Sequence, residues 1–336
     1  MDLVVDTYGS SVRRKSNCFL IRKRDEVEEV CADDVAQIVL MLGTHISTDA
    51  IALAAEKNVD IVCISRYGEP ISRIWPCKFG GTALTRRKQM EALHDQRGVK
   101  VAEAMIKAKG LNQAYLLRAL NKERNIKEIH EIAEIIQNRV KAAKWDADEI
   151  ENVRNEMFAI EGGCSRLYIQ ALSMVIPEEY GFRGREKRPP KDPVNAALSY
   201  GYGVLYGKVE RACILAGLDP FLGYLHTDRF GKPSMVLDLI EPFRQPLIDR
   251  TVVTLFTRRT FNDDDFMPYE EECGLYLNER GRKKLLEKLY ERFDKEILYK
   301  GRKRKFQDII LLSIRNVATY LLGESKKVEA FVYSWS

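Results

Sequence analysis

Apolar side chains recur along this chain at two different spacings, and the change between them falls near residue 77. Before that point, short runs rich in Val, Ile and Leu alternate with charged or glycine-containing turns, a pattern typical of β-strands. The predicted strands cover residues 3–9, 17–24, 36–43, 59–66 and 71–76. Ser47 precedes a stretch with helical spacing that ends near Asn58, which predicts one short helix with Ser47 as its N-cap.

After Gly80-Gly81 the apolar positions follow a period near 3.6 residues, as in amphipathic helices. The predicted helices cover residues 86–109, 111–122, 126–144, 147–160, 161–175, 194–216, 281–298 and 307–323. We therefore predict an α+β protein with a small N-terminal β-sheet domain that holds one short helix, followed by a larger all-α C-terminal domain. The expected boundaries are 1–76 for the β domain, 77–85 for a Gly-rich linker and 86–336 for the helical domain.

The composition is that of a globular chain. Its 336 residues are 45% hydrophobic and 31% charged, and at roughly 100–200 residues per domain the length suggests two domains. No apolar run approaches the roughly 20 residues that span a bilayer. The first 15 residues lack the apolar core of a secretory signal. We therefore expect a cytoplasmic protein with no membrane partner.

Charge separates the two halves of the chain. Residues 1–80 carry ten basic and 12 acidic side chains, whereas residues 81–336 carry 44 basic and 37 acidic ones. Part of this excess lies in residues 181–193, which also contain three prolines and are predicted to form an extended basic loop. A second basic run covers residues 300–305. Both runs could contact a polyanion, although basic residues at helix ends are also common on ordinary surfaces.

Candidate chemistry is concentrated after His226. Asp238 and Glu241 follow it by 12 and 15 positions. Because they are three residues apart on a predicted helix, the two carboxylates share one helix face. Apolar neighbours indicate that this face borders a buried surface, and Pro242 is expected to bend the helix.

A partly buried carboxylate beside an imidazole needs a compensating charge. One imidazole with one or two carboxylates, and no thiolate in reach, favours Mn²⁺ or Mg²⁺ over zinc. A structural alternative stays open: Asp238 could cap the helix or pair with Arg244 or Arg250, with His226 as a hydrogen-bonded structural residue.

Glu161 is the third candidate, because it precedes two consecutive glycines inside a helical stretch. Each glycine costs about 1 kcal/mol relative to alanine in a helix. The cost is tolerable where another group approaches the backbone closely. A simple junction between two helices explains the pair equally well.

Four segments occur in an order and spacing that resemble one known family. They are IEGGCSRLYIQAL, RPPKDPVNAALSYGYGVLYG, GLDPFLGYLH and PSMVLDLIEPFR. The chain is similar, over nearly its whole length, to the CRISPR-associated spacer-acquisition integrases, the larger and catalytic subunits of the complex that captures new spacers. The segment STDAIALAAEKNVDIVCISRYGEPISRIWP agrees with the same family.

The resemblance implies a metal-dependent DNA endonuclease and integrase whose Mn²⁺ or Mg²⁺ is held by Glu161, His226 and an acidic residue that Glu241 matches by spacing. Many members carry Asp at that third place, so either Asp238 or Glu241 is the direct ligand. Arg244 matches a basic position that follows it. The resemblance also implies a homodimer that joins a small ferredoxin-like CRISPR-associated protein in a heterohexamer.

The implied reaction is attack by the 3′-OH of incoming DNA on a phosphodiester of the CRISPR repeat, with double-stranded and branched DNA as partners. Candidate phosphate contacts are Arg86, Arg87, Arg183, Arg185, Arg188, Lys191 and Arg244. Two other functions remain open at this point. One is a DNA-binding scaffold of the same fold without turnover, and the other is an unrelated helical metalloenzyme acting on small molecules.

Overall fold

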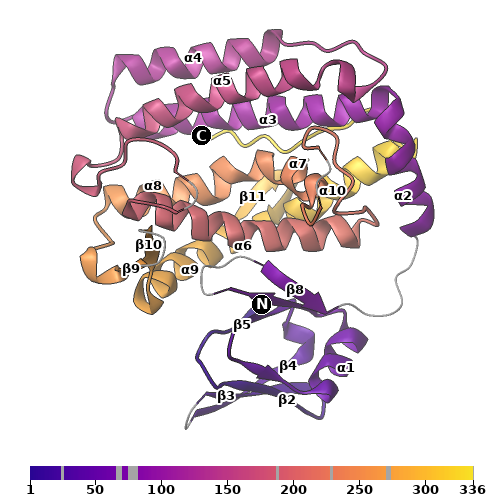
Figure 1. The fold of residues 1–336 in the computed structure, drawn as a ribbon, viewed down its shortest axis with the longest axis vertical. Coiled ribbons are helices and arrows are strands. Elements are labelled where there is room, and N and C mark those ends of the chain that lie inside the picture. The colour runs from indigo at the N-terminus through magenta and orange to yellow at the C-terminus, as the bar shows by residue number, and fades with distance from the viewer. Residues whose placement is uncertain are drawn as a thin grey trace. The chain divides into compact units, whose positions relative to one another are not determined.

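The chain folds into two compact units, Met1–Gly80 and Gly81–Ser336. The computed structural model describes residues 1–23, 26–65, 70–74, 82–186, 189–227, 230–269 and 274–335. Strands dominate the first unit and helices the second (Figure 1). Of the predicted linker, residues 77–81 lie outside the described ranges, and from residue 82 the chain is already helical. In these ranges no helix is both long and apolar enough to cross a bilayer.

The described residues of the N-terminal unit form two four-stranded sheets rather than the single small sheet expected. The strands are β1 (Asp2–Val5), β2 (Ser11–Lys15), β3 (Cys18–Lys23), β4 (Glu26–Cys31), β5 (Gln37–Met41), β6 (His45–Ile46), β7 (Asp60–Ile64) and β8 (Pro70–Ile74). One sheet has the order β1-β5-β7-β8 and the other β4-β3-β2-β6. Strands β2 and β4 were not predicted because each has three exposed charged side chains and no run of buried apolar ones, so neither has an apolar signature.

The one helix predicted for this unit is confirmed as α1 (Thr48–Lys57). The Ser47 hydroxyl accepts a hydrogen bond from the Ala50 amide at 3.3 Å, which caps the first turn. Asn58 ends the helix in the left-handed conformation, with φ of 56°. Leu53 is completely buried and packs in the core of this unit.

The larger unit is built on nine α-helices in its described residues. They are α2 (Thr82–Glu91), α3 (Gln96–Asn121), α4 (Lys127–Ala142), α5 (Arg154–Ser173), α6 (Pro193–Leu215), α7 (Ser234–Phe243), α8 (Arg250–Thr257), α9 (Glu279–Asp294) and α10 (Phe306–Leu321). A π-helical segment, Arg244–Asp249, joins α7 to α8 and begins two residues after Pro242. The predicted bend at this proline is thus realised as a wider helical turn.

The expectation of an all-α second domain is wrong in one detail. In the part of the chain that the structure describes, two pairs of short antiparallel strands lie among the helices, β9 (Phe266–Tyr269) with β10 (Gly274–Leu277), and the hairpin of β11 (Glu296–Tyr299) with β12 (Arg302–Lys305). This hairpin contains the whole basic run 300–305. Strand β12 has four consecutive exposed basic residues, so it lacks the alternation that identifies a strand.

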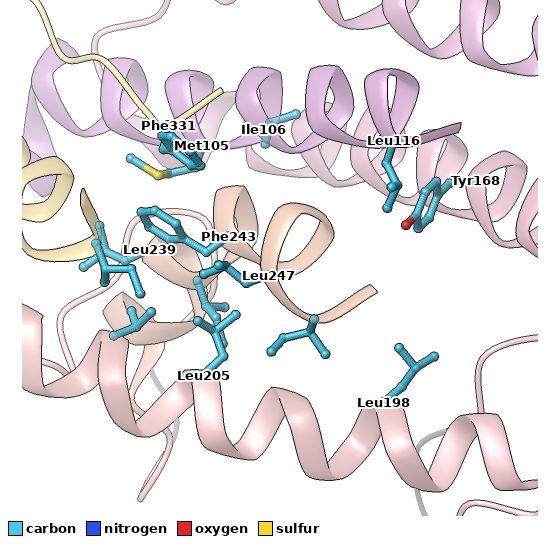
Figure 2. Packing of buried hydrophobic residues seen from close by; sticks show 14 of the residues in the cluster. Met105, Ile106, Leu116, Tyr168, Leu198, Leu205, Leu239, Phe243, Leu247 and Phe331 are labelled. Atoms are coloured by element: carbon cyan, nitrogen blue, oxygen red, sulfur yellow. The ribbon is translucent and has the colours of Figure 1, made fainter. Parts of the chain in front are cut away.

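Helices α3, α4 and α5 pack on one another, and α7 lies between α3 and α6 (Figure 1). Figure 2 shows the contact: Phe243 and Leu247 point into the space between Met105 of α3 and Leu205 of α6. All four side chains are at most 2% exposed. The apolar face of α7 is therefore held on both sides, which fixes the direction of its polar residues.

Two predicted helix breaks are wrong. Helix α3 runs through Gly110. Position 110 is a glycine because a side chain there would collide with Val140 of α4, and glycine permits the close approach of the two helices. Helix α5 likewise runs through Gly162 and Gly163. A Cβ at Gly163 would lie 2.8 Å from Nη1 of Arg139 on α4. The glycines beside Glu161 thus fit the close-approach interpretation and not the helix junction.

Candidate active site

Four charged side chains meet inside the larger unit, one each from α3, α5, α7 and the π-helical segment that follows α7. The ammonium of Lys109, on α3, contacts Glu161 of α5 and lies 2.6 Å from Oε2 of Glu241 on α7. Nη2 of Arg244 lies 3.2 Å from the other oxygen of Glu241. The side chains of Lys109 and Glu241 are only 9% and 6% exposed. The two glutamates predicted as metal ligands therefore approach one common point.

Neighbouring polar groups fix the Glu161 carboxylate in place. The Ser165 hydroxyl, one turn later on α5, donates to Oε1 of Glu161 at 3.2 Å. Gln113 of α3 donates to the same hydroxyl at 3.3 Å. This chain of hydrogen bonds joins α3 to α5 directly beside the charged cluster.

Asp238 is fully engaged in orienting His226 and the loop before α7. Its Oδ2 accepts from the Tyr224 and Leu225 amides at 2.7 and 2.9 Å. Its Oδ1 accepts from the His226 amide at 3.0 Å and lies 2.7 Å from Nδ1 of the same residue. The structural alternative is thus half right: Asp238 organises this loop and bonds His226, and its partners here do not include Arg244 or Arg250.

The contact between Nδ1 of His226 and Asp238 leaves Nε2 as the ring nitrogen that faces away from the Asp238 carboxylate. Because a carboxylate only accepts hydrogen bonds, Nδ1 carries a proton and the neutral ring has its lone pair on Nε2. A histidine that ligates a metal commonly donates its other nitrogen to a carboxylate in this way. The His226 ring also packs edge-on against the ring of Phe158, with 5.7 Å between the ring centroids. Phe158 lies one turn before Glu161 on α5.

Electrostatics keep Glu241 ionised despite its burial. Burial pushes the pKa of Glu241 upward, but the charges of Arg244 and Lys109 outweigh it and bring the pKa down to about 2. Burial would lower the pKa of Lys109, and the two glutamates raise it instead. Lys109 and Glu241 are therefore both charged at neutral pH.

The donor set fits a divalent cation in its chemistry. It comprises two carboxylates and Nε2 of an imidazole. Oε2 of Glu241 is buried, and apart from its ion pair with Lys109 it has no hydrogen bond to any residue that the structure describes. As placed, no three His, Cys, Asp or Glu side chains in the described ranges are grouped as a ready metal site. The ammonium of Lys109 lies between the two carboxylates instead.

Lys109 was not singled out from the sequence, although the sequence contains a signal for it. It occurs between Met105 and Asn112 on the face of α3 that also bears Leu116, and all four side chains are buried. A lysine at a core position needs a buried counter-ion. The pattern could therefore have predicted an internal ion pair, although not its partners.

A second buried cluster also escaped prediction. The hydroxyls of Tyr168 and Tyr202 donate to the two oxygens of Asp249 at 2.7 and 2.6 Å. The ring of Tyr202 faces the guanidinium groups of Arg244 at 4.9 Å and Arg185 at 5.5 Å. This cluster supports Arg244 from behind the charged site.

The predicted DNA contacts differ in how free they are. Arg86 and Arg87 are exposed on α2, and Nε of Arg86 lies 3.9 Å from Oδ2 of Asp219. Arg183 is exposed, and Lys191 lies 3.8 Å from Glu186. Arg188 lies outside the described residues.

Arg185 has a different environment from its neighbours in the basic loop. Its guanidinium donates to Asn195 at 2.7 Å and to Ser199 at 2.9 Å, both on α6. These bonds fasten the loop to the helix, so Arg185 has a structural task that its sequence position did not indicate.

Comparisons with known proteins agree with this architecture. A family model described as CRISPR associated protein Cas1 matches residues 3–291. The chain is 36% identical to the CRISPR-associated endonuclease Cas1 1 of Archaeoglobus fulgidus, over 100% of both chains. It superposes on a casposase bound to integration product with a TM-score of 0.83 at 23% identity, covering 98% of this chain and 92% of that one. It also superposes on a chain of a Cas6-RT-Cas1–Cas2 complex with a TM-score of 0.78 at 18% identity, covering 98% and 36%. The last two likenesses establish the fold, and the first two establish that the chain belongs to the Cas1 family of CRISPR-associated endonucleases.

Proposed function

We propose that this protein is a divalent-metal-dependent DNA endonuclease and integrase that inserts captured DNA fragments into a CRISPR array. The observation that carries the proposal is the approach of Glu161 and Glu241 to one point, the ammonium of Lys109, together with the orientation of His226 by Asp238. Mn²⁺ or Mg²⁺ held by Glu161, Glu241 and Nε2 of His226 would polarise a phosphodiester oxygen and lower the pKa of an attacking hydroxyl.

The protein's own residues supply position and charge. Asp238 keeps Nε2 of His226 free, which makes it a positioning residue. Glu241 is the better candidate for the direct carboxylate, because Asp238 already accepts two hydrogen bonds on each oxygen. Arg244 balances the charge of Glu241 and is itself supported by the ring of Tyr202.

DNA is the proposed substrate, and the basic loop is its proposed binding surface. Arg183 and Lys191 would contact phosphates, together with Arg86 and Arg87 of α2 and with Arg188. Such contacts fix the register of the DNA without reading its sequence. The titles of the casposase and Cas1–Cas2 structures name an integration product and a second Cas protein. By analogy, this chain would act as a homodimer that joins a small ferredoxin-like Cas2 partner.

The test is Mn²⁺-dependent strand transfer on branched DNA by wild-type protein and by Glu161→Ala. We expect the substitution to abolish transfer while DNA binding persists, since the phosphate contacts lie elsewhere. Glu156→Ala is the matched control, because Glu156 is exposed on the same helix α5. Equal transfer by wild type and Glu161→Ala would contradict the proposal and assign the chain to a DNA-binding scaffold without turnover.

A further inference from the structure

The proposed metal site already contains a cation that belongs to the protein, the ammonium of Lys109. It contacts Glu161 and lies 2.6 Å from Oε2 of Glu241. These are the two carboxylates assigned above to the divalent cation. Both cations therefore require the same pair of oxygen donors in the same buried space.

The cluster is electrically balanced as it stands. Glu161 and Glu241 supply two negative charges, and Lys109 and Arg244 supply two positive ones. A divalent cation added beside an unmoved Lys109 would leave an excess of two positive charges. Like charges a few ångströms apart repel strongly where water is excluded.

We infer that Lys109 competes with the divalent cation for Glu161 and Glu241, and thereby makes cation binding depend on a DNA phosphate. This inference rests on the proposed function. A phosphate supplies the negative charge that the cluster lacks once the cation is bound, and the displaced ammonium can donate to that phosphate. Coupling between two ligands is reciprocal, so DNA should tighten cation binding and the cation should tighten DNA binding.

Lys107 provides a matched control on the same helix. Lys107 forms an ion pair with a residue one turn earlier on α3: its ammonium lies 2.6 Å from Oε1 of Glu103. Lys109 instead links two other helices through their carboxylates. A merely structural role for Lys109 would affect thermal stability but would not tighten metal binding when the lysine is removed.

The experiment measures Mn²⁺ binding to the full-length protein from the electron paramagnetic resonance signal of free Mn²⁺, with and without a branched DNA. The proteins are wild type, Lys109→Met, Lys107→Met and Glu161→Gln. We expect DNA to tighten binding to wild type by at least about tenfold. Lys109→Met should bind at least about tenfold tighter than wild type without DNA, and should gain less from DNA. Lys107→Met should match wild type.

Unchanged or weaker Mn²⁺ binding by Lys109→Met would overturn the inference, provided that Glu161→Gln reduces Mn²⁺ binding as the proposed site requires. The proposed function would then stand. If no Mn²⁺ binding depends on Glu161, with or without DNA, both the inference and the proposed function fail. Should Lys109→Met not fold, Lys109→Gln is measured in its place with the same expectations, because it removes the charge and keeps a polar end.

Discussion

Two buried carboxylates near opposite ends of the α7–α8 connection are stabilised in opposite ways. Glu241 and Asp249 are 5% and 1% exposed. Cations surround Glu241, and its pKa falls to about 2 even though burial opposes this. Asp249 accepts hydrogen bonds from two tyrosine hydroxyls. Burial raises its pKa above the usual value, because these hydrogen bonds offset only part of the desolvation of the charged carboxylate. Equal burial therefore produces opposite shifts, and the kind of partner decides the sign.

The comparison distinguishes the candidate metal site around Glu241 from the tyrosine–aspartate cluster around Asp249 that stabilises it. A lysine ammonium can be exchanged for another cation, whereas the hydroxyls of Tyr168 and Tyr202 hold Asp249 in a fixed frame. The two clusters share Arg244, which pairs with Glu241 and stacks on Tyr202. We interpret Asp249 as structural support for the guanidinium beside the active site.

The largest expected effect comes from Glu241→Gln. The substitution removes the charge that pairs with Lys109 and Arg244, so two buried cations share only Glu161. Breaking a buried ion pair in this way costs about 3–5 kcal/mol of unfolding free energy. We also expect Mn²⁺-dependent strand transfer to fall to background. Chemical denaturation and a strand-transfer assay measure the two effects.

Asp249→Asn is the counterpart and should leave strand transfer measurable. An amide oxygen can still accept from one tyrosine hydroxyl, so the expected loss is about 1–3 kcal/mol for the other buried hydrogen bond. If Asp249→Asn abolishes transfer at unchanged stability, the division into site and support is wrong.

His226→Ala should have the next largest effect. It removes the proposed nitrogen ligand while the backbone amides that bond Asp238 remain. We expect loss of metal-dependent strand transfer with DNA affinity largely unchanged. His130→Ala is the control, because His130 is exposed on α4. Collapse of the fold in His226→Ala, seen as loss of the cooperative unfolding transition, would instead make His226 structural.

Asp238→Asn tests whether orientation of the ring matters in its own right. Removing a partner that orients a metal-ligating histidine typically costs about 10–100-fold in activity or metal affinity. We therefore expect a partial loss of strand transfer, smaller than for His226→Ala. A loss as complete as that of His226→Ala would indicate that Asp238 is itself a ligand.

The pH dependence of stability should reveal the opposite signs directly. Glu241 releases its proton near pH 2 in the folded protein but near pH ~4.3 when unfolded, so its contribution is complete above that range and is lost as the pH falls toward 2. For Asp249 the folded pKa is the higher one, so its contribution is lost as the pH rises through that value. Denaturation between pH 2.5 and 6 should show that Glu241→Gln flattens the rise of stability with pH and that Asp249→Asn steepens it. Identical slopes in both variants would contradict these assignments.

Much of the fold could be predicted because long helices repeat their apolar positions. Helices α4, α6 and α10 match their predicted ranges within two residues. The failures have local causes. Gly110 was interpreted as a break and Gly163 as either a helix junction or a close approach, yet each accommodates a side chain of α4. Strands β4 and β12 have exposed polar side chains and give no apolar signal.

The site could be predicted only where residue types themselves limit the chemistry. Glu161, His226 and Glu241 were singled out by type, spacing and family resemblance, and the structure brings the two glutamates to a common point. Lys109 was missed because its partners are distant in the chain, and no spacing rule connects α3 to α5 and α7. The saturation of Asp238 by three backbone amides depends on how the loop folds, which side-chain identity does not encode.

The smallest expected effect concerns the surface charge of the basic loop. Arg183 and Arg185 differ there, because one guanidinium is exposed and the other is engaged in hydrogen bonds. Arg183 is exposed, whereas Arg185 donates to Asn195 and Ser199. Arg183→Ala should therefore lower the slope of log Kd against log salt by about 0.9, the value for one phosphate contact, at unchanged stability. Arg185→Ala should weaken DNA binding and also loosen the basic loop, so its effect should include a lower melting temperature. Arg13→Ala, an exposed arginine of the N-terminal unit, is the control. A slope that responds to Arg185 and not to Arg183 would mean that the basic loop rearranges when DNA binds, releasing the cation that the free protein uses to fasten it.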